Sequence, residues 1–482
     1  MPTPTPETLL DLFRADLPAP QTLGRDLIGK DAQIDGPFGP QTLVYADYVA
    51  SGRALHCVER FVLERVLPYY ANSHTEASFC GGYMTRLRAS ARATVARHCG
   101  ADDRYATVFA GSGATAGVNR LVALLGADHG RVKVILGPYE HHSNILPWRE
   151  CGAQVIELPE DAAGGPDRAA LEAALADTAD FDRVICAFSA ASNVTGIIAD
   201  VCALTRRVKD AGALMVWDYA GGGPYLPIAM TPSEGVEIDA LVLSPHKFIG
   251  GPGASGVVIV RRDVVVTDRP TWAGGGTVRF VTSQDHDYAG DIEHREEAGT
   301  PNVIGDIRAA LAVIVKDHIG AEMMAQRNAA LTDRALTAWQ DAPEIEVLGH
   351  PEAQRLPIIS FRIRDPQGGF IHQQLVTKML SDRFGIQARG GCACAGPYVL
   401  RLLGYDADSA TALRAEILAG DELKKPGFVR LNFSVLMTEA EVMHILDSVR
   451  TLSRDAAQFV AQYDVDPARA IFTARAGVLA AQ

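Results

Sequence analysis

The sequence has few of the features that mark secreted, membrane-spanning or nucleic-acid-binding proteins. Only eight cysteines occur in 482 residues, too few for a disulfide framework in so long a chain, so we expect a reducing, cytoplasmic setting. No apolar run approaches the ~20 residues that a membrane-spanning helix needs, and the start of the chain lacks the pattern of a signal peptide. The net charge of −13 argues against nucleic acid or an anionic membrane as a partner.

The composition is that of an ordinary globular protein. Hydrophobic residues make up 48% of the chain and charged residues 21%, and the length suffices for two domains. Seven short apolar segments lie between residues 105 and 262, with helix-length segments between many of them, which predicts an α/β fold with a mostly parallel sheet covered on both faces. The expected strands are Ala106–Ala110, Val132–Leu136, Val155–Leu158, Val184–Phe188, Leu214–Trp217, Ala240–Leu243 and Gly256–Val260.

Other segments carry weaker but definite patterns. Residues 43–49 are typical of a strand, and residues 303–340 have apolar positions at the spacing of one long helix. Residues 358–363 and 428–433 predict two strands of a second domain. Thr438-Glu-Ala-Glu441 is a capping box that predicts the start of a helix.

Several chemically useful side chains follow the expected strands, at the edge where open α/β sheets bind ligands. Lys247, in Ser244-Pro-His246-Lys247, would be partly desolvated there and able to attack a carbonyl. Asp218 could pair with a protonated ring nitrogen. The glycine-containing turn at 111–115 would let backbone N–H groups approach a phosphate at the start of a helix.

Two further polar segments complete this set. His141, in the segment 140–144, could lie flat against a heteroaromatic ring, and Asn193 adds a side-chain amide at another strand end. Each residue alone has an ordinary explanation, as a surface lysine, a turn residue or part of a polar loop. Together they offer an amine, a partner for a ring nitrogen, a ring-stacking group and a phosphate site, which is what pyridoxal phosphate requires.

With these motifs the chain resembles the class V, fold type I pyridoxal-phosphate enzymes, and among them the group II cysteine desulfurases and selenocysteine lyases. The resemblance covers residues 44–302 and returns at 384–396 and 428–445. The matching segments are Tyr45-Ala-Asp47, Thr115-x-x-x-Asn119, Glu140-His141-His142-x-Asn144-x-x-Pro147-Trp148, Ser192-Asn193-Val-x-Gly196, Asp218, Ser244-x-His246-Lys247, Gly274-Gly275-Gly276 and Ala298-Gly-Thr300-Pro-Asn302.

This resemblance implies a seven-stranded type of sheet flanked by helices, with a smaller α+β domain at the C-terminus. Residues 1–40 would form an N-terminal arm that packs with the small domain, and residues 41–302 the large, cofactor-binding domain. Residues 303–482 would form the small domain. Within it, 384–396 would be the active-site loop and 397–427 an insertion near the active-site mouth.

The resemblance also assigns roles on the cofactor side. Lys247 would form the Schiff base with the cofactor and move the Cα proton, Asp218 would pair with the pyridine nitrogen, and His141 would stack on the ring. Thr277, after Gly276, resembles a residue that reaches the phosphate of the partner subunit, so a homodimer is implied. The phosphate would be bound by Ala114, Thr115, Ser244 and His246.

On the substrate side, the resemblance implies that Asn193 faces the substrate and the cofactor oxygen, and that Arg430 grips the substrate carboxylate. A planar guanidinium suits that task because it can form paired hydrogen bonds. Cys394, in Arg389-Gly-Gly-Cys392-Ala-Cys394, aligns with the family's nucleophilic cysteine. Arg389 is expected near the substrate and would favour the thiolate. In an extended loop Cys392 and Cys394 would point to the same side, so Cys392 could resolve a persulfide or form a disulfide.

Three departures from the family pattern concern the substrate and the reaction, and leave the expected cofactor unchanged. Gly221 stands where the family commonly has a glutamine that binds the cofactor oxygen. Ala393 replaces the histidine expected just before the cysteine. The segment 397–427 adds length before Arg430.

The function that these residues imply is removal of sulfur from L-cysteine, or of selenium from selenocysteine, giving alanine and a persulfide on Cys394, with a sulfur-acceptor protein as a candidate partner. The first alternative is another class V activity on a different amino acid, such as an aminotransferase, epimerase or lyase. Metal or iron–sulfur binding by Cys392 and Cys394 is a poor alternative, because two ligands do not make a site. An inactive scaffold would have no reason to keep Lys247 and Asp218 together.

Overall fold

The computed structural model describes residues 5–73 and 75–475, which form two compact units. The sheet unit comprises the chain up to residue 28 together with residues 51–191 and 199–323. The C-terminal unit comprises residues 29–50, 192–198 and those from 324 onward. The chain therefore passes between the units several times, and each unit is described by itself.

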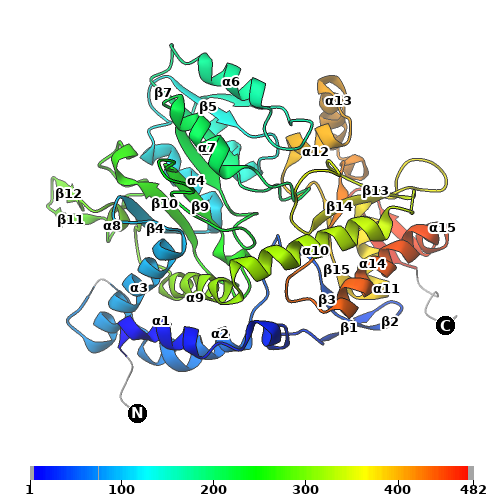
Figure 1. Cartoon of the computed structure of the whole chain (residues 1–482), viewed down its shortest axis with the longest axis horizontal. Helices are drawn as coiled ribbons and strands as arrows, with labels where there is room; N and C mark the ends of the chain where they lie inside the picture. Colours follow the sequence, from blue (N-terminus) through cyan, green and yellow to red (C-terminus); the bar gives the residue numbers. More distant parts are fainter. Residues whose placement is uncertain (1–4, 74, 476–482) are drawn as a thin grey trace. The chain divides into compact units, whose positions relative to one another are not determined.

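The sheet unit is built on seven strands in the order β4-β10-β9-β8-β7-β5-β6 (Figure 1). Only β10 runs antiparallel to its neighbours, β4 and β9, while the other pairings are parallel. This confirms the predicted mostly parallel sheet. The strands are β4 (Tyr105–Gly111), β5 (Val132–Leu136), β6 (Gln154–Glu157), β7 (Arg183–Ser189), β8 (Leu214–Asp218), β9 (Ala240–Leu243) and β10 (Gly256–Arg261).

Helices cover both faces of this sheet. Val216 of β8 belongs to the buried cluster that includes helix α4 (Gly113–Leu124). The next residue, Trp217, points to the other face, where its indole N–H donates to Thr205 of helix α7 (Val201–Asp210) at 2.9 Å. Both faces are thus shielded, which is why the strands are continuous apolar segments.

Residues 5–28 pack within the sheet unit. Helix α1 (Pro6–Ala15) buries Leu9, Leu10 and Phe13 on the side that contacts helices α3 and α9. The segment expected as one N-terminal arm is thus divided, with residues 29–40 in the C-terminal unit. The other helices of this unit are α2 (His56–Phe61), α3 (Phe79–His98), α5 (Leu146–Glu150), α6 (Arg168–Ala176), α8 (Ile292–Glu296) and α9 (Val303–Ile319).

The prediction of a single long helix over residues 303–340 is wrong. Helix α9 ends at Ile319 and α10 (Ala321–Trp339) begins after Gly320, whose φ of 88° interrupts the helix. Glycine adopts this conformation without the steric penalty that other residues would meet.

The C-terminal unit contains a four-stranded antiparallel sheet in the order β13-β14-β17-β16. Of the strand expected over 43–49, only Val44–Tyr45 is a strand, and it pairs with β15. The capping box at Thr438 is confirmed at the start of α14. The strands are β13 (Ile345–Val347), β14 (Ile358–Ile363), β15 (Ile386–Gln387), β16 (Arg389–Gly391), β17 (Phe428–Asn432) and β3 (Val44–Tyr45), with the hairpins β1 (Gln33–Gly36)–β2 (Gly39–Thr42) and β18 (Tyr463–Asp466)–β19 (Ile471–Ala474).

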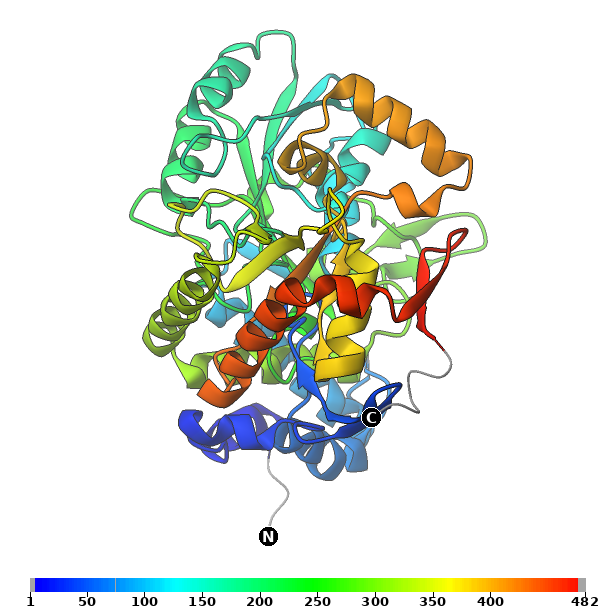
Figure 2. The ribbon, with the colours of Figure 1, turned by 90° about the vertical axis from the view of Figure 1, so that its right-hand side faces the viewer.

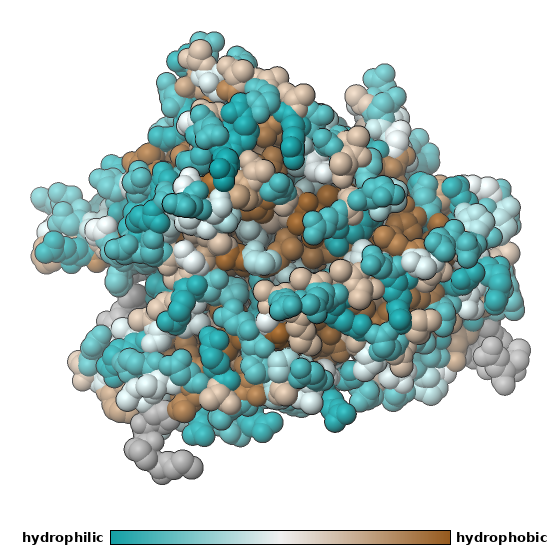
Figure 3. All heavy atoms as spheres, in the orientation of Figure 1, coloured by the Kyte–Doolittle hydropathy of each residue, from teal (hydrophilic) through white to brown (hydrophobic). Residues whose placement is uncertain are grey.

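The expected insertion at 397–427 is mainly helical, and its two α-helices are the orange ones in Figure 2. Figure 3 shows one face of the molecule, on which hydrophilic and apolar residues are interspersed. Within the described residues, no helix combines the length and apolar character needed to cross a membrane. The helices of the C-terminal unit are α11 (Gln373–Phe384), α12 (Gly396–Leu402), α13 (Ala407–Leu418), α14 (Glu439–Arg454) and α15 (Ala456–Val460).

Candidate active site

Asp218 and Lys247 lie after the carboxyl ends of two neighbouring parallel strands. Asp218 is the last residue of β8, and Lys247 ends the short 3-10 turn η5 (Pro245–Lys247) that follows β9. The Asp218 side chain is 3% exposed and accepts a hydrogen bond from the Ala220 N–H at 2.7 Å. Burial raises the pKa of Asp218, while that hydrogen bond and the charge of Lys247 act in the opposite direction. A buried carboxylate of this kind suits a cationic partner such as a protonated ring nitrogen.

The predicted phosphate site is a close junction between the start of α4 and the residues after β9. The Ala114 N–H donates to Ser244 Oγ at 3.0 Å. Gly113 has a φ of 66°, and a Cβ on it would lie 2.8 Å from the His246 ring. The site therefore needs glycine here, and backbone N–H groups at a helix start are ready to bind a phosphate. Burial, followed by the charge of Lys247, lowers the pKa of His246 to about 4, so this imidazole is neutral at pH 7.

His141 lies in the short loop after β5 and is half-buried. Its Nδ1 accepts a hydrogen bond from the Ser143 N–H at 3.1 Å and lies 3.0 Å from Ser143 Oγ. Ser143 Oγ in turn lies 2.7 Å from Thr115 Oγ. The loop that carries the predicted ring-stacking residue is thereby joined to the helix start that carries the predicted phosphate site.

Glu140, to which the sequence assigned only a place in a polar loop, is the buried anchor of this loop. Its carboxylate accepts hydrogen bonds from Ser189 N–H (2.8 Å), Ser189 Oγ (2.6 Å) and Asn144 Nδ2 (2.7 Å). Burial raises the pKa of Glu140 to about 7, against these hydrogen bonds, and the charge of Asp218 adds to the rise. Glu140, Asn144 and Trp148 follow one another at intervals of four residues, and this spacing is the sequence signal that could have predicted their contacts. In the structure the Trp148 indole N–H donates to Asn144 Oδ1 at 3.1 Å.

The loop after Asp218 contains Gly221, at the position where the family commonly has glutamine. The half-buried Lys316 of α9 donates to the carbonyls of Gly223 (2.6 Å) and Leu226 (2.5 Å) in this loop. Burial lowers the pKa of Lys316 to about 8. Lys316 was not among the predicted site residues, since nothing near it in the sequence points to this contact.

Thr277 precedes the hairpin of β11 (Val278–Val281) and β12 (His286–Tyr288) in the sheet unit. It is fully buried in the chain, and its hydroxyl donates to the Gly274 carbonyl at 2.7 Å. Its role toward a partner subunit stays a prediction.

Four of the predicted site residues lie in the C-terminal unit, where remote segments bring them together. Arg430 of β17 is 3% exposed, and its Nη1 donates to the Asn193 carbonyl at 2.9 Å. Its Nη2 donates to Asp47 Oδ1 at 2.8 Å, and Arg389 Nε donates to Asp47 Oδ2 at 2.9 Å. Asp47, which had no predicted role, thus joins the two arginines.

The loop with the cysteines is a tight turn and not the extended segment that was expected. The Ala395 N–H donates to the Cys392 carbonyl at 3.1 Å, and Ala393 (φ 49°) and Cys394 (φ 54°) are both left-handed. Such a conformation costs roughly 1–2 kcal/mol for each non-glycine residue. Asn193 Nδ2 donates to the Ala393 carbonyl at 2.8 Å, and Cys394 is exposed. The argument that both cysteines point to one side of an extended loop therefore does not hold.

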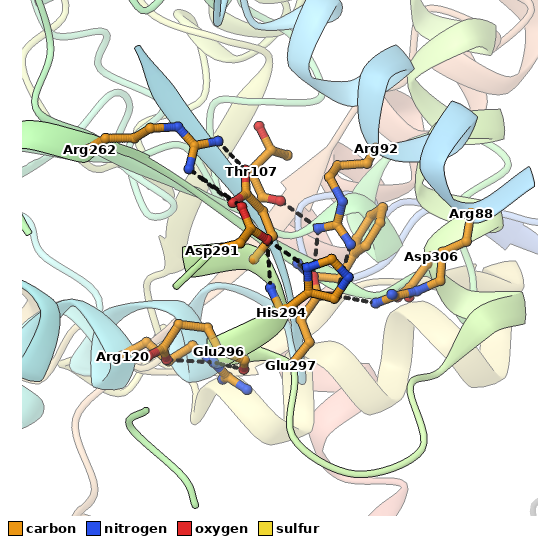
Figure 4. A network of polar contacts seen from close by, with 12 residues as sticks. Arg88, Arg92, Thr107, Arg120, Arg262, Asp291, His294, Glu296, Glu297 and Asp306 are labelled. Carbon is orange, nitrogen blue, oxygen red and sulfur yellow. Dashed lines mark hydrogen bonds and ion pairs between the residues drawn. The ribbon is translucent and has the colours of Figure 1, made fainter. Parts of the chain in front are cut away.

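A cluster of arginines and carboxylates in the sheet unit contains no predicted site residue (Figure 4). Glu297 accepts hydrogen bonds from Arg88, Arg92 and the Phe109 N–H, and Arg88 also donates to Asp306 at 2.6 Å. These contacts join α3, β4 and the start of α9.

Of the predicted cofactor residues, Asn193 lies in the C-terminal unit, and the sheet unit contains Ala114, Thr115, His141, Asp218, Ser244, His246, Lys247 and Thr277. Those around the strand ends and the start of α4 fit a phosphate-bearing pyridine ring. The sequence profile of the family described as "Aminotransferase class-V" matches residues 44–445. The chain belongs to the class-V aminotransferase family.

Two bacterial proteins described as a cysteine desulfurase and a probable cysteine desulfurase are similar over most of the chain. The cysteine desulfurase of Pectobacterium atrosepticum is 30% identical over 368 residues, covering 74% of this chain and 85% of that protein. The probable cysteine desulfurase of Streptomyces coelicolor is 27% identical over 375 residues, with the same coverage.

Solved structures show the same fold. The cysteine desulfurase from Thermococcus onnurineus NA1 matches with a TM-score of 0.73 and 24% identity, over 91% of this chain and 99% of that one. The cysteine desulfurase CsdA from Escherichia coli matches with a TM-score of 0.70 and 21% identity, over 90% and 98%. The chain is therefore a class V pyridoxal-phosphate enzyme similar to cysteine desulfurases.

Proposed function

We propose that the protein is a cysteine desulfurase that takes sulfur from L-cysteine, or selenium from selenocysteine, and leaves alanine. The observation that carries this proposal is the position of Cys394 in the C-terminal unit. Its thiol is exposed on a turn held by Asn193, and Asn193 is itself held by Arg430. A candidate nucleophile is thus tied to Asn193 and Arg430, two of the three residues predicted to contact the substrate.

The residues of the sheet unit would hold the cofactor. Lys247 would bind its aldehyde carbon, Asp218 would keep a proton on its ring nitrogen, and the start of α4 with Ser244 would take its phosphate. Pyridoxal phosphate, when bound, supplies an electron sink for the pair left at Cα when a proton is removed. Lys247 would move that proton, because a neutral amine is a competent base.

The residues of the C-terminal unit would act on the substrate. Arg430 would bind the α-carboxylate, and the Cys394 thiolate would attack the substrate sulfur. The new S–S bond forms as the C–S bond breaks, and protonation of the remaining carbon skeleton gives alanine. Cysteine and the Cys394 thiol are thereby converted to alanine and a persulfide, with no other oxidant or reductant.

The test replaces the proposed nucleophile. Cys394→Ser should abolish alanine release from L-cysteine while leaving the absorbance band of the bound cofactor unchanged. Mass spectrometry of the wild type after cysteine addition should find one extra sulfur on Cys394. Cys392→Ser is the matched control, two residues away in the same turn, and should keep substantial activity. Alanine release by Cys394→Ser at the wild-type rate would contradict the proposal.

A second candidate is another class V activity on a different amino acid, such as an aminotransferase, epimerase or lyase. Gly221 and Ala393, at the positions of the family's glutamine and histidine, favour it. A panel of amino acids assayed for sulfide, alanine and keto acid, with a dithiol added to reduce the persulfide to thiol and sulfide, would separate the two. Only the desulfurase releases alanine and sulfide from cysteine together.

We also propose a cytoplasmic homodimer that passes its sulfur to an acceptor protein. Thr277, in the segment that resembles the family's phosphate-reaching loop, supports the dimer. Sedimentation of the purified protein tests it, and a monomer at micromolar concentration would contradict it.

A further inference from the structure

Asp47 is fixed in place by the backbone around it. It forms a bridge with Asn432, the last residue of β17, and the neighbouring Ala46 carbonyl accepts a hydrogen bond from the Asn432 N–H at 2.8 Å. Tyr45 Oη donates to the Asp47 carbonyl at 3.2 Å. The side chain is 10% exposed, so its carboxylate occupies a defined position. Through the bridge to Asn432, Asp47 lies beside β17, two positions along that strand from Arg430.

The two arginines that share this carboxylate are direct cross-strand partners. Arg389 of β16 lies opposite Arg430 of β17 in the antiparallel register. Like charges directly opposite each other on neighbouring strands are destabilising. Asp47 removes this repulsion, because its Oδ1 accepts from Arg430 and its Oδ2 from Arg389, at 2.8 and 2.9 Å.

These ion pairs join two guanidinium groups to one carboxylate, so the three side chains together carry a charge of +1. Arg389 uses only its Nε in the pair, and its side chain is 50% exposed. A second carboxylate, supplied by a ligand, would balance the charge and meet donors that already have a fixed orientation.

We propose that Asp47 is a positioning residue: it holds Arg430 and Arg389 as a preformed site for the α-carboxylate, and so restricts substrates to amino acids with a free carboxylate. This inference rests on the proposed binding of an amino acid at Arg430. The physical basis of the inference is preorganisation. A guanidinium held by a fixed carboxylate loses less conformational freedom when the ligand binds.

The negative charge of Asp47 could either weaken carboxylate binding, by neutralising Arg430, or strengthen it, by positioning both arginines. These opposite effects make the inference testable. If Asp47 served only to neutralise Arg430, its removal would leave a stronger positive charge and tighten carboxylate binding. If it positions the two arginines, Asp47→Asn should weaken binding, because an amide can accept from one guanidinium but presents N–H donors to the other. The sign of the change therefore separates the two roles.

The experiment uses the cofactor-loaded protein and measures dissociation constants from the change in cofactor absorbance. Asp47→Asn should raise the Kd for L-alanine roughly tenfold or more, while the Kd for ethylamine, which lacks only the carboxylate, stays at the wild-type value. In turnover of L-cysteine, KM should rise by a larger factor than kcat falls. Asp47→Glu keeps the negative charge and should restore part of the affinity. Should Asp47→Asn fail to fold, Arg389→Gln, at a half-exposed position, should weaken L-alanine selectively.

Asp306→Asn is the control for a general loss of stability, because it breaks another buried ion pair, Arg88–Asp306 at 2.6 Å. It should leave the Kd for L-alanine unchanged. Unchanged or tighter L-alanine binding by Asp47→Asn, or equal weakening of L-alanine and ethylamine, would overturn the inference. Because L-alanine binding needs no turnover, a wild type that binds L-alanine but never desulfurates cysteine would contradict the proposed function alone.

Discussion

Glu297 in the sheet unit and Asp47 in the C-terminal unit are both buried carboxylates shared by two arginines, yet their surroundings differ. Around Glu297, Asp306 supplies a second carboxylate, so two acids face Arg88 and Arg92 (Figure 4). The Arg88 and Arg92 side chains are 8% and 20% exposed, whereas Arg389 beside Asp47 is 50% exposed. One cluster is closed and balanced in charge, and the other is open and has an excess positive charge.

The difference shows that burial and ion pairing alone do not mark a functional site. Glu297 also accepts from the Phe109 N–H, and Arg92 donates to the Thr107 carbonyl, so that cluster fastens the edge strand β4 to neighbouring helices. The Asp47 cluster instead leads, through Arg430 and Asn193, to the turn that carries Cys394. Charge balance and what lies at the end of the network distinguish the structural cluster from the candidate site.

The largest effect on the free energy of unfolding should come from removing the shared carboxylate of the charge-balanced cluster. Glu297→Ala leaves Arg88 and Arg92 buried without their shared carboxylate and should lower the free energy of unfolding by about 3–5 kcal/mol. Asp47→Ala should lower it less, because the half-exposed Arg389 can turn to water. Denaturant unfolding of both variants measures the difference. An equal loss would erase the distinction between the two clusters.

Glu140 sharpens the comparison, because it is a buried glutamate held by neutral donors. At Glu297 burial would raise the pKa, but the hydrogen bond and charge of Arg92 outweigh it and hold the pKa below its usual value. At Glu140 burial prevails and the pKa is about 7. Since the folded protein then binds the proton more tightly than the unfolded chain, Glu140 favours folding below pH ~4.3, and this contribution is lost as the pH rises to about 7.

Glu140→Gln should remove this dependence. The free energy of unfolding of the wild type, relative to the variant, should fall by about 3 kcal/mol between pH 4.5 and pH 7.5. Unfolding curves at these two pH values check it. A difference that is constant or rises with pH would mean that Glu140 stays ionised in the folded protein.

The smallest effect on the free energy of unfolding concerns backbone strain at Ala393, in the turn that Asn193 holds. Ala393→Gly should raise the free energy of unfolding by about 0.5–1 kcal/mol, because relief at a positive φ exceeds the added freedom of the unfolded chain. The matched control is Ala325→Gly on an exposed position of α10, where the same change should cost about 1 kcal/mol. Destabilisation by Ala393→Gly would show that this turn is not strained.

The sheet could be predicted from the sequence because most of its strands are buried on both faces and appear as short, mainly apolar segments, in spite of polar residues such as Thr107 and Lys133. The positions of Asp218 and Lys247 followed from the rule that ligands bind at strand ends. The backbone of the Cys394 turn was predicted wrongly, since neither Ala393 nor Cys394 favours a left-handed conformation. The roles of Asp47 and Glu140 could not be predicted, because their partners lie far away in the chain, 383 residues from Asp47 to Arg430 and 49 from Glu140 to Ser189.

The separation of Asp47 from Arg430 also has a consequence for the protein as it is synthesised. At about 5–20 residues per second, a ribosome needs roughly 20–80 s to cover 383 residues. Residues 29–50 and 192–198 therefore leave the ribosome long before residues such as Asn432 and Arg355, with which Asp47 and Ile197 form bridges in the C-terminal unit. The seven-stranded sheet has all of its strands once residue 261 is made, so it can form first, while the candidate carboxylate site is assembled only near the end of translation.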